Sequence, residues 1–193
     1  MPFDPQAYGP EVAKLLGLDG DGQRLLPLVC DGSASRLSGL ICADLFQNAR
    51  HPRGAHAGLW LYFSCFDASH EIAQEDKSVE GSYWHAILHR QEPDDFNAGY
   101  WFGRVGQHAI YPQLARDAAE IASRYPGCGL QLKPTGWDPQ SFVAYCALAR
   151  TRAGSVQEQV ALEVQRAEWQ LLFDHCASSS SDLPAVLPAV LKD

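Results

Sequence analysis

Apolar side chains recur at helical spacing along most of the chain, and no window alternates apolar and polar residues with the period of a strand. The two clearest stripes run at spacings of three and four residues: Leu59, Phe63, Phe66, His70 and Ala73, and Val156, Val160, Val164, Ala167 and Leu171. Such stripes are typical of helices that bury one face. We therefore predict an all-α fold, a single-domain bundle of six or seven helices with mostly antiparallel neighbours.

The length of 193 residues suits one domain with a sizeable core. Residues 1–32 are predicted as an irregular lead-in to a single helical domain that extends to residue 177, and residues 178–193 as a loosely held tail rich in Ser and Pro. Helices are expected over about 33–45, 55–74, 82–91, 94–105, 112–124 and 138–152, with a last one from 156. The helices at 55–74, 82–91 and 94–105 should lie at the centre.

Charge and composition exclude several classes of partner. A net charge of −8 without a basic run argues against nucleic acid and against anionic membrane surfaces. The longest apolar run, 58–63, is too short to span a bilayer, and the first residues resemble no signal peptide, so a cytoplasmic protein is expected. The six scattered cysteines predict buried thiols in a reducing compartment. The pattern carries no signal for an oligomeric state.

Six of the seven histidines fall between His51 and His108. Among them, His85 and His89 are four residues apart on one predicted helix, which is the spacing of helical zinc ligands. Ala86 stands where zinc proteases carry a glutamate after the first histidine, so their general base is missing. Structural, hydrogen-bonded histidines are the alternative interpretation.

His70 continues an apolar helical stripe, where an unpaired polar ring would be costly. We expect it either to be a satisfied core histidine or to meet His85 or His89 across a helix contact. In the second case the three imidazoles, completed by Glu80, by Glu92 or by a water, would bind a divalent metal such as Zn²⁺. The same histidines with Glu92 are the candidate catalytic groups for proton transfer.

Five further residues near these histidines are candidate ligand contacts. The guanidinium groups of Arg90 and Arg104 suit a carboxylate or phosphate, and Asn97, Tyr100 and Trp101 could line the same pocket. The competing interpretation is a salt-bridge network at a helical turn, with the aromatic rings in the core.

The middle third of the chain also carries a distinctive run of motifs. These are Ser69-His70-Glu71, Trp84-His85-Ala86-Ile87-Leu88-His89-Arg90, Glu92-Pro93-Asp94, Asn97-Ala98 and Tyr100-Trp101-Phe102. The block from Gly58 to Tyr111 resembles a family of bacterial and fungal proteins of about this length that has no assigned activity. The resemblance implies that the block is a unit, and it carries over no residue roles, substrate or cofactor.

Two hypotheses of function remain from the sequence. One is a small-molecule site, metal-assisted or hydrolytic, in the block of histidine and aromatic residues at 56–108. The other is a helical protein-interaction module in which this block is structural core. Exposure distinguishes them, because a site needs histidines that reach solvent, whereas a module needs an apolar outer surface.

Overall fold

The computed structural model describes residues 2–30, 43–134 and 136–179, and its described part is all-α, as predicted. The α-helices are α1 (Pro10–Gly17), α2 (Pro52–Tyr62), α3 (Phe66–Glu75), α4 (Val79–Gln91), α5 (Asp95–Val105), α6 (Tyr111–Ser123), α7 (Pro139–Arg150) and α8 (Val156–Ala177). Two short 3₁₀ helices, Pro5–Tyr8 and Ala43–Phe46, accompany them. None of the described helices is long and apolar enough to cross a membrane.

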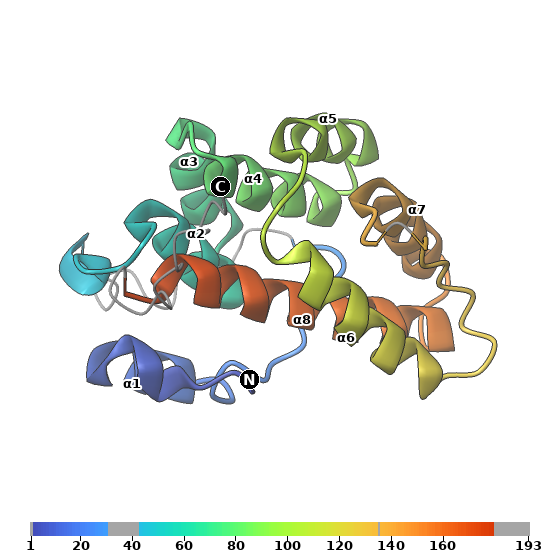
Figure 1. Cartoon of the computed structure of the whole chain (residues 1–193), viewed down its shortest axis with the longest axis horizontal. Coiled ribbons are helices and arrows are strands. Elements are labelled where there is room, and N and C mark those ends of the chain that lie inside the picture. Colours follow the sequence, from blue (N-terminus) through green and yellow to red (C-terminus); the bar gives the residue numbers. More distant parts are fainter. Residues whose placement is uncertain (1, 31–42, 135, 180–193) are drawn as a thin grey trace, which may run out of the picture.

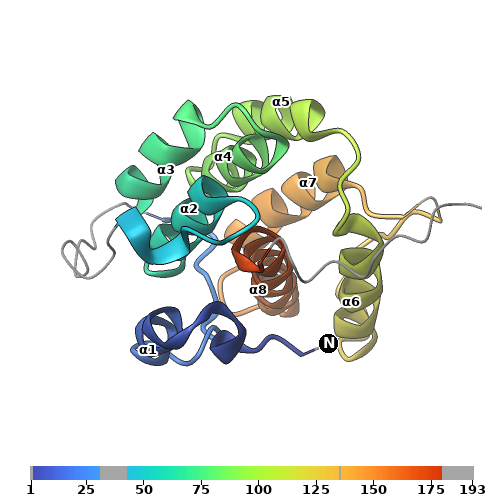
Figure 2. The ribbon, with the colours of Figure 1, turned by 60° about the vertical axis from the view of Figure 1, so that its left-hand side comes forward.

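Helix α8 is the axis of the bundle, and it contacts α2, α6 and α7 (Figure 1). Helices α2 to α5 follow one another along one side of α8, where α4 contacts α2, α3 and α5 (Figure 2). The tight packing has a local cause at Gly58, because a Cβ atom there would lie 2.6 Å from the Trp84 ring. Trp169 of α8 donates its indole N–H to the Gly58 carbonyl oxygen at 2.8 Å. The glycine thus brings α2 against both α4 and α8.

A buried ion pair links α4 to α8. Arg90 and Glu168, with side chains 1% and 0% exposed, lie 2.5 Å apart from Nη2 to Oε2. The Tyr83 hydroxyl donates to the other Glu168 oxygen at 3.0 Å, and the Arg90 guanidinium lies over the rings of Phe102 and Phe142. A buried pair of this kind specifies one arrangement of its helices more than it adds stability.

The helix predicted over 55–74 is two helices, α2 and α3, and this part of the prediction is wrong. The chain turns between them at Ser64, whose φ of 60° ends the helix. The apolar stripe continues through the turn because both helices pack on the same core, so periodicity gave no sign of the break. The lead-in, predicted as extended or short-helical, contains one short α-helix, α1, over Pro10–Gly17.

Helix α4 begins earlier than the start predicted at residue 82, because Ser78 is its N-cap. The Ser78 Oγ accepts from the Gly81 N–H at 2.9 Å, while the Ser78 N–H donates to Asp76 Oδ1 at 2.9 Å. A Cβ atom at Gly81 would lie 2.4 Å from the Asp76 carbonyl oxygen, so the first turn fits under this loop only with glycine. The earlier start places Glu80 in the first turn of α4.

The later helices begin where their capping residues predict. Asp138 caps α7 and Ser155 caps α8, and each side chain accepts a backbone N–H of the first turn. Most of the helix expected over 33–45 and most of the expected tail from 178 lie outside the described residues. Of the six cysteines, Cys128, Cys146 and Cys176 are buried free thiols, as expected, while Cys42 lies outside the described residues.

Candidate functional site

Three histidines from two neighbouring helices meet on one side of α4. His70 comes from α3, and His85 and His89 come from successive turns of α4. Each ring offers a nitrogen, and the three nitrogens lie within 4.8 Å of one another. We call His70, His85 and His89 the histidine triad. The structure therefore brings together the three histidines that the sequence singled out.

The closest contact in the triad joins Nε2 of His70 to Nε2 of His85 at 3.0 Å. Two nitrogen ligands of a tetrahedral zinc ion at 2.0–2.1 Å stand about 3.3 Å apart, so the two atoms nearly match that spacing. The His70 and His85 rings are perpendicular, at 83°, whereas His85 and His89 stack with centroids 4.7 Å apart. The arrangement suits either a chain of imidazole hydrogen bonds or a shared ion.

Burial favours the neutral form of His70 and His85. It is the main cause that lowers the pKa of His85 from 6.5 to about 3, and the neighbouring His70 and His89 add to the shift. Burial also lowers the pKa of His70. Because a metal binds the unprotonated imidazole, two of the three rings are in the ligating form at neutral pH.

Helix α5 and the turn before it surround the triad. Trp101 lies against His85 with ring centroids 4.1 Å apart, and the Arg104 guanidinium lies 5.2 Å from the centre of the Trp101 ring. Glu92 accepts from or pairs with Nδ1 of His89 at 2.9 Å, while half of its side chain remains exposed. This carboxylate–imidazole pair fixes the orientation of His89, as carboxylates do for metal-bound histidines.

The other residues predicted as ligand contacts, Arg90, Asn97 and Tyr100, do not contact the triad rings in the interactions found for them. Arg90 is wrong as a ligand contact, because it lies in the core, paired with Glu168. The Asn97 side chain donates to Asp94 at 2.6 Å, so it holds the start of α5. Tyr100 is 54% exposed and packs edge-on against Trp101. Charged groups that act on the triad rings include Glu92, Asp67 and Lys77, and Arg104 lies close by over Trp101.

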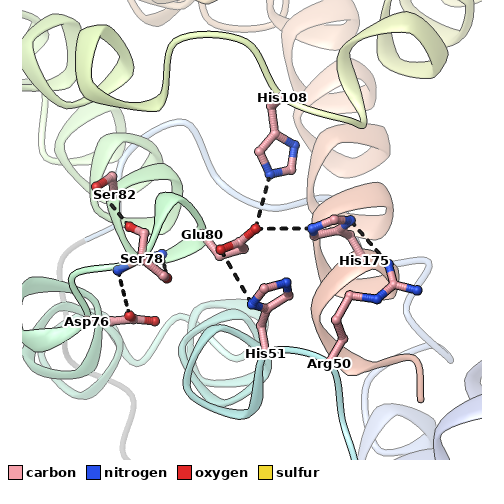
Figure 3. Close-up of polar contacts among 9 residues, drawn as sticks. Arg50, His51, Asp76, Ser78, Glu80, Ser82, His108 and His175 are labelled. Atoms are coloured by element: carbon pink, nitrogen blue, oxygen red, sulfur yellow. Dashed lines mark hydrogen bonds and ion pairs between the residues drawn. The ribbon is translucent and has the colours of Figure 1, made fainter. Parts of the chain in front are cut away.

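Glu80 is also wrong as the fourth ligand of the triad. It lies near the start of α4 and contacts three other histidines, His51, His108 and His175 (Figure 3). Sequence reasoning missed this second group because its members come from four elements, with no spacing that relates them. We call His51, Glu80, His108 and His175 the Glu80 centre.

Three cavities in the described part of the chain have no histidine in their lining. One of about 530 Å³ lies between the N-terminal segment, α6 and α8, and its lining includes Phe3, Arg124 and Leu171. No histidine lines it, and its acidic residues are not joined to either group. A substrate of the triad would instead approach at the surface, where the His89 side chain is 12% exposed.

No family model, curated protein or solved structure matches the chain. The function must therefore be argued from the residues themselves.

Proposed function

We propose that the histidine triad binds a first-row divalent ion such as Zn²⁺. We further propose that the bound ion is part of a site that hydrolyses small molecules. The observation that carries the proposal is the convergence of three imidazole nitrogens within 4.8 Å, with two of them 3.0 Å apart. Three protein ligands are the usual number for a catalytic zinc ion, which keeps a further position for water or substrate.

The triad suits a cation better than a proton. An additional proton on the His70–His85 pair would place a positive charge among buried groups, and the low pKa of His85, about 3, reflects how strongly burial disfavours that charge. A divalent ion supplies enough binding energy to offset the same desolvation, because it forms bonds with all three rings. When bound, it would act as a Lewis acid toward a coordinated oxygen.

The surrounding side chains have separate roles in this proposal. Glu92 orients His89 through Nδ1 at 2.9 Å and leaves the other ring nitrogen for the ion. Trp101 covers His85 and keeps bulk water from that side. Arg104, held 5.2 Å over the Trp101 ring, is placed to bind a carboxylate or phosphate of the substrate.

The test uses the full chain after treatment with a chelator. Zinc chloride is added, and binding is measured by calorimetry and by metal analysis after dialysis. His85→Gln and His89→Gln should each weaken zinc binding at the triad by about 100-fold or more. His56→Gln on α2 is the matched control, because His56 belongs to neither histidine group. Equal zinc affinity in His85→Gln and in the unaltered chain would overturn the metal site.

The hydrolytic part needs its own measurement. Zinc-loaded protein should hydrolyse a nitrophenyl ester or phosphate ester faster than the chelated protein, and His85→Gln should abolish the difference. Circular dichroism must show that the variant keeps its helices. Stoichiometric zinc without metal-dependent hydrolysis of either probe would leave a metal-binding protein and remove the hydrolytic assignment.

An interaction module remains a second candidate because of one observation. Phe96 and Tyr100, four residues apart on α5, are 85% and 54% exposed, so one helix face presents two large rings to solvent. Phe96→Ser should leave stability within about 0.5 kcal/mol, as for most surface changes. If the variant alters self-association in ultracentrifugation while zinc binding is absent, this second candidate is favoured.

A further inference from the structure

The carboxylate of Glu80 is the focus of a polar cluster that the triad does not use. Nε2 of His175 lies 3.2 Å from Oε1, Nδ1 of His51 lies 3.5 Å from Oε2, and Nε2 of His108 lies 3.8 Å from Oε1. Figure 3 shows the three rings pointing at this carboxylate from different directions. They come from the residue before α2, from α8 and from the segment between α5 and α6.

Backbone contacts fix this convergence. The His51 N–H donates to the Cys176 carbonyl oxygen and the Arg50 N–H to that of Ser178, both at 2.9 Å, so the segment before α2 is tied to the end of α8. A Cβ atom at Gly54 would lie 2.9 Å from Cys176 Sγ and 3.5 Å from Glu80 Cβ. The glycine thus allows α2 to approach both elements and sets His51 beside His175, with ring planes 16° apart.

Among the described residues, no arginine or lysine forms an ion pair with the Glu80 carboxylate. The Glu80 side chain is 11% exposed, and the ion-pair partners found for it are all imidazoles. A buried anion among imidazoles is a setting that attracts a cation.

The three imidazoles are not equivalent. Nδ1 of His108 accepts the Ile110 N–H at 3.3 Å, so in the neutral ring the proton is on Nε2, facing Glu80. This places His108 as a donor that orients the carboxylate. His51, Glu80 and His175 offer one ligand atom each within 4.8 Å of one another. Two imidazoles and one carboxylate form a donor set that suits iron, manganese, cobalt or zinc as divalent ions.

We infer that His51, Glu80 and His175 form a second divalent-metal site, separate from the histidine triad, in which His108 positions the carboxylate. The site is open on one side, because 31% of the His51 side chain is exposed. Three protein ligands leave room for water or a small oxygen ligand. The inference does not depend on the function proposed for the triad.

One neighbour opposes the ion and gives a sharp test. Arg50 Nη1 lies 3.5 Å from Nδ1 of His175, where it adds positive charge and points an N–H at an atom that must itself carry the proton when Nε2 binds a metal. Arg50→Met removes both effects. It should therefore strengthen metal binding at this site, by about 3-fold to 10-fold.

The experiment treats the full chain with a chelator, titrates it with cobalt chloride and counts the equivalents of cobalt bound. The unaltered chain should bind two equivalents, Glu80→Gln and His85→Gln one each, and the double variant none. In the His85→Gln background, Glu80→Gln should weaken the remaining site by about 100-fold or more. Glu75→Gln is the matched control, since Glu75 is a surface residue with 63% of its side chain exposed.

The outcomes separate the two metal sites. If Glu80→Gln keeps both equivalents at unchanged affinity, the second site does not exist. If His85→Gln keeps both, the triad proposal fails and the second site stands only if Glu80→Gln removes one. Should Glu80→Gln lose its helical circular dichroism, His51→Gln replaces it, because the His51 side chain makes no capping hydrogen bond. A weaker site in Arg50→Met would also contradict the inference.

Discussion

The histidine triad and the Glu80 centre both gather imidazoles against α4, yet they differ in charge and in construction. The triad is built from rings of two adjacent helices and holds no buried carboxylate, with Glu92 half exposed beside it. The Glu80 centre surrounds a buried anion with rings from three other parts of the chain. Burial favours the neutral form in both groups. It prevails at His85 in the triad, whereas in the centre hydrogen bonds from His108 and His175 keep Glu80 charged despite burial.

This difference determines which metal ions each group should prefer. The triad offers neutral nitrogen ligands, which favour zinc and other imidazole-binding metals, and the centre adds an oxygen ligand with a full negative charge, which widens the choice to iron and manganese. Four predictions test the contrast, beginning with the helix that the two groups share.

The largest effect on stability is expected from breaking the buried ion pair between Arg90 of α4 and Glu168 of α8. Arg90→Met leaves the Glu168 carboxylate buried without its cation, which should lower the free energy of unfolding by about 3–5 kcal/mol in urea titrations of the chelated protein. The double variant Arg90→Met, Glu168→Leu should recover most of the loss. If the free energy of unfolding of Arg90→Met is within about 1 kcal/mol of that of the unaltered chain, this pair does not stabilise the position of α4. The two groups on α4 would then not depend on it.

The next largest effect is expected in how protein stability depends on pH, which should differ between the two groups. The folded pKa of His85 is about 3, below its ordinary 6.5, so the unfolded chain takes up this proton first. The stability that depends on neutral His85 is therefore complete above pH 6.5 and is lost as the pH falls from 6.5 toward 3, by about 2 kcal/mol at pH 5. His70 adds to the loss in the same direction. Exposed His51 contributes less.

Glu80 behaves differently along the same titration. Its folded pKa lies below the ordinary 4.5, so the stability from its charged form is present above pH 4.5 and is lost only at lower pH. The urea midpoint of the metal-free protein is measured at each pH. For His85→Gln it should change less with pH between 6.5 and 5 than it does for the unaltered chain. For Glu80→Gln it should change less only below pH 4.5. The same slope in all three proteins would remove the electrostatic contrast.

Glu92→Gln should act on the triad alone. The amide orients His89 less strongly than the carboxylate, so zinc binding at the triad should weaken by about 10-fold to 100-fold. The fold should be unchanged, because half of the Glu92 side chain is exposed. Calorimetry in the Glu80→Gln background isolates the triad, with Glu75→Gln as the matched exposed control. If Glu92→Gln instead weakens cobalt binding at the Glu80 centre, measured in the His85→Gln background, the two groups behave as one.

The smallest effect is expected from His108→Asn, which acts on the Glu80 centre alone. The Asn side-chain oxygen can still accept the Ile110 N–H, while the donor that faces Glu80 is lost. Cobalt binding at the centre should weaken by about 10-fold, in the His85→Gln background, while the helical circular dichroism stays the same. An unchanged cobalt affinity would show that the carboxylate keeps its position without His108.

The all-α class and most helix positions follow from the sequence, because apolar periodicity and capping residues are local properties. Asp138 and Ser155 begin their helices where their side chains predict. The same locality explains the errors: a stripe that continues from α2 into α3 conceals the turn at Ser64, and Ser82 resembles a cap although Ser78 is the one used.

For the candidate sites, the sequence by itself determined that His85 and His89 share a face, because four residues make about one helical turn. It also indicated His70, through a polar ring on an apolar stripe. Only the tertiary structure decided that Arg90 pairs with Glu168 in the core and that Glu80 meets His51, His108 and His175. Those contacts join residues up to 95 positions apart, and backbone hydrogen bonds and close glycine contacts between helices hold them in place. No spacing along the chain encodes such distances.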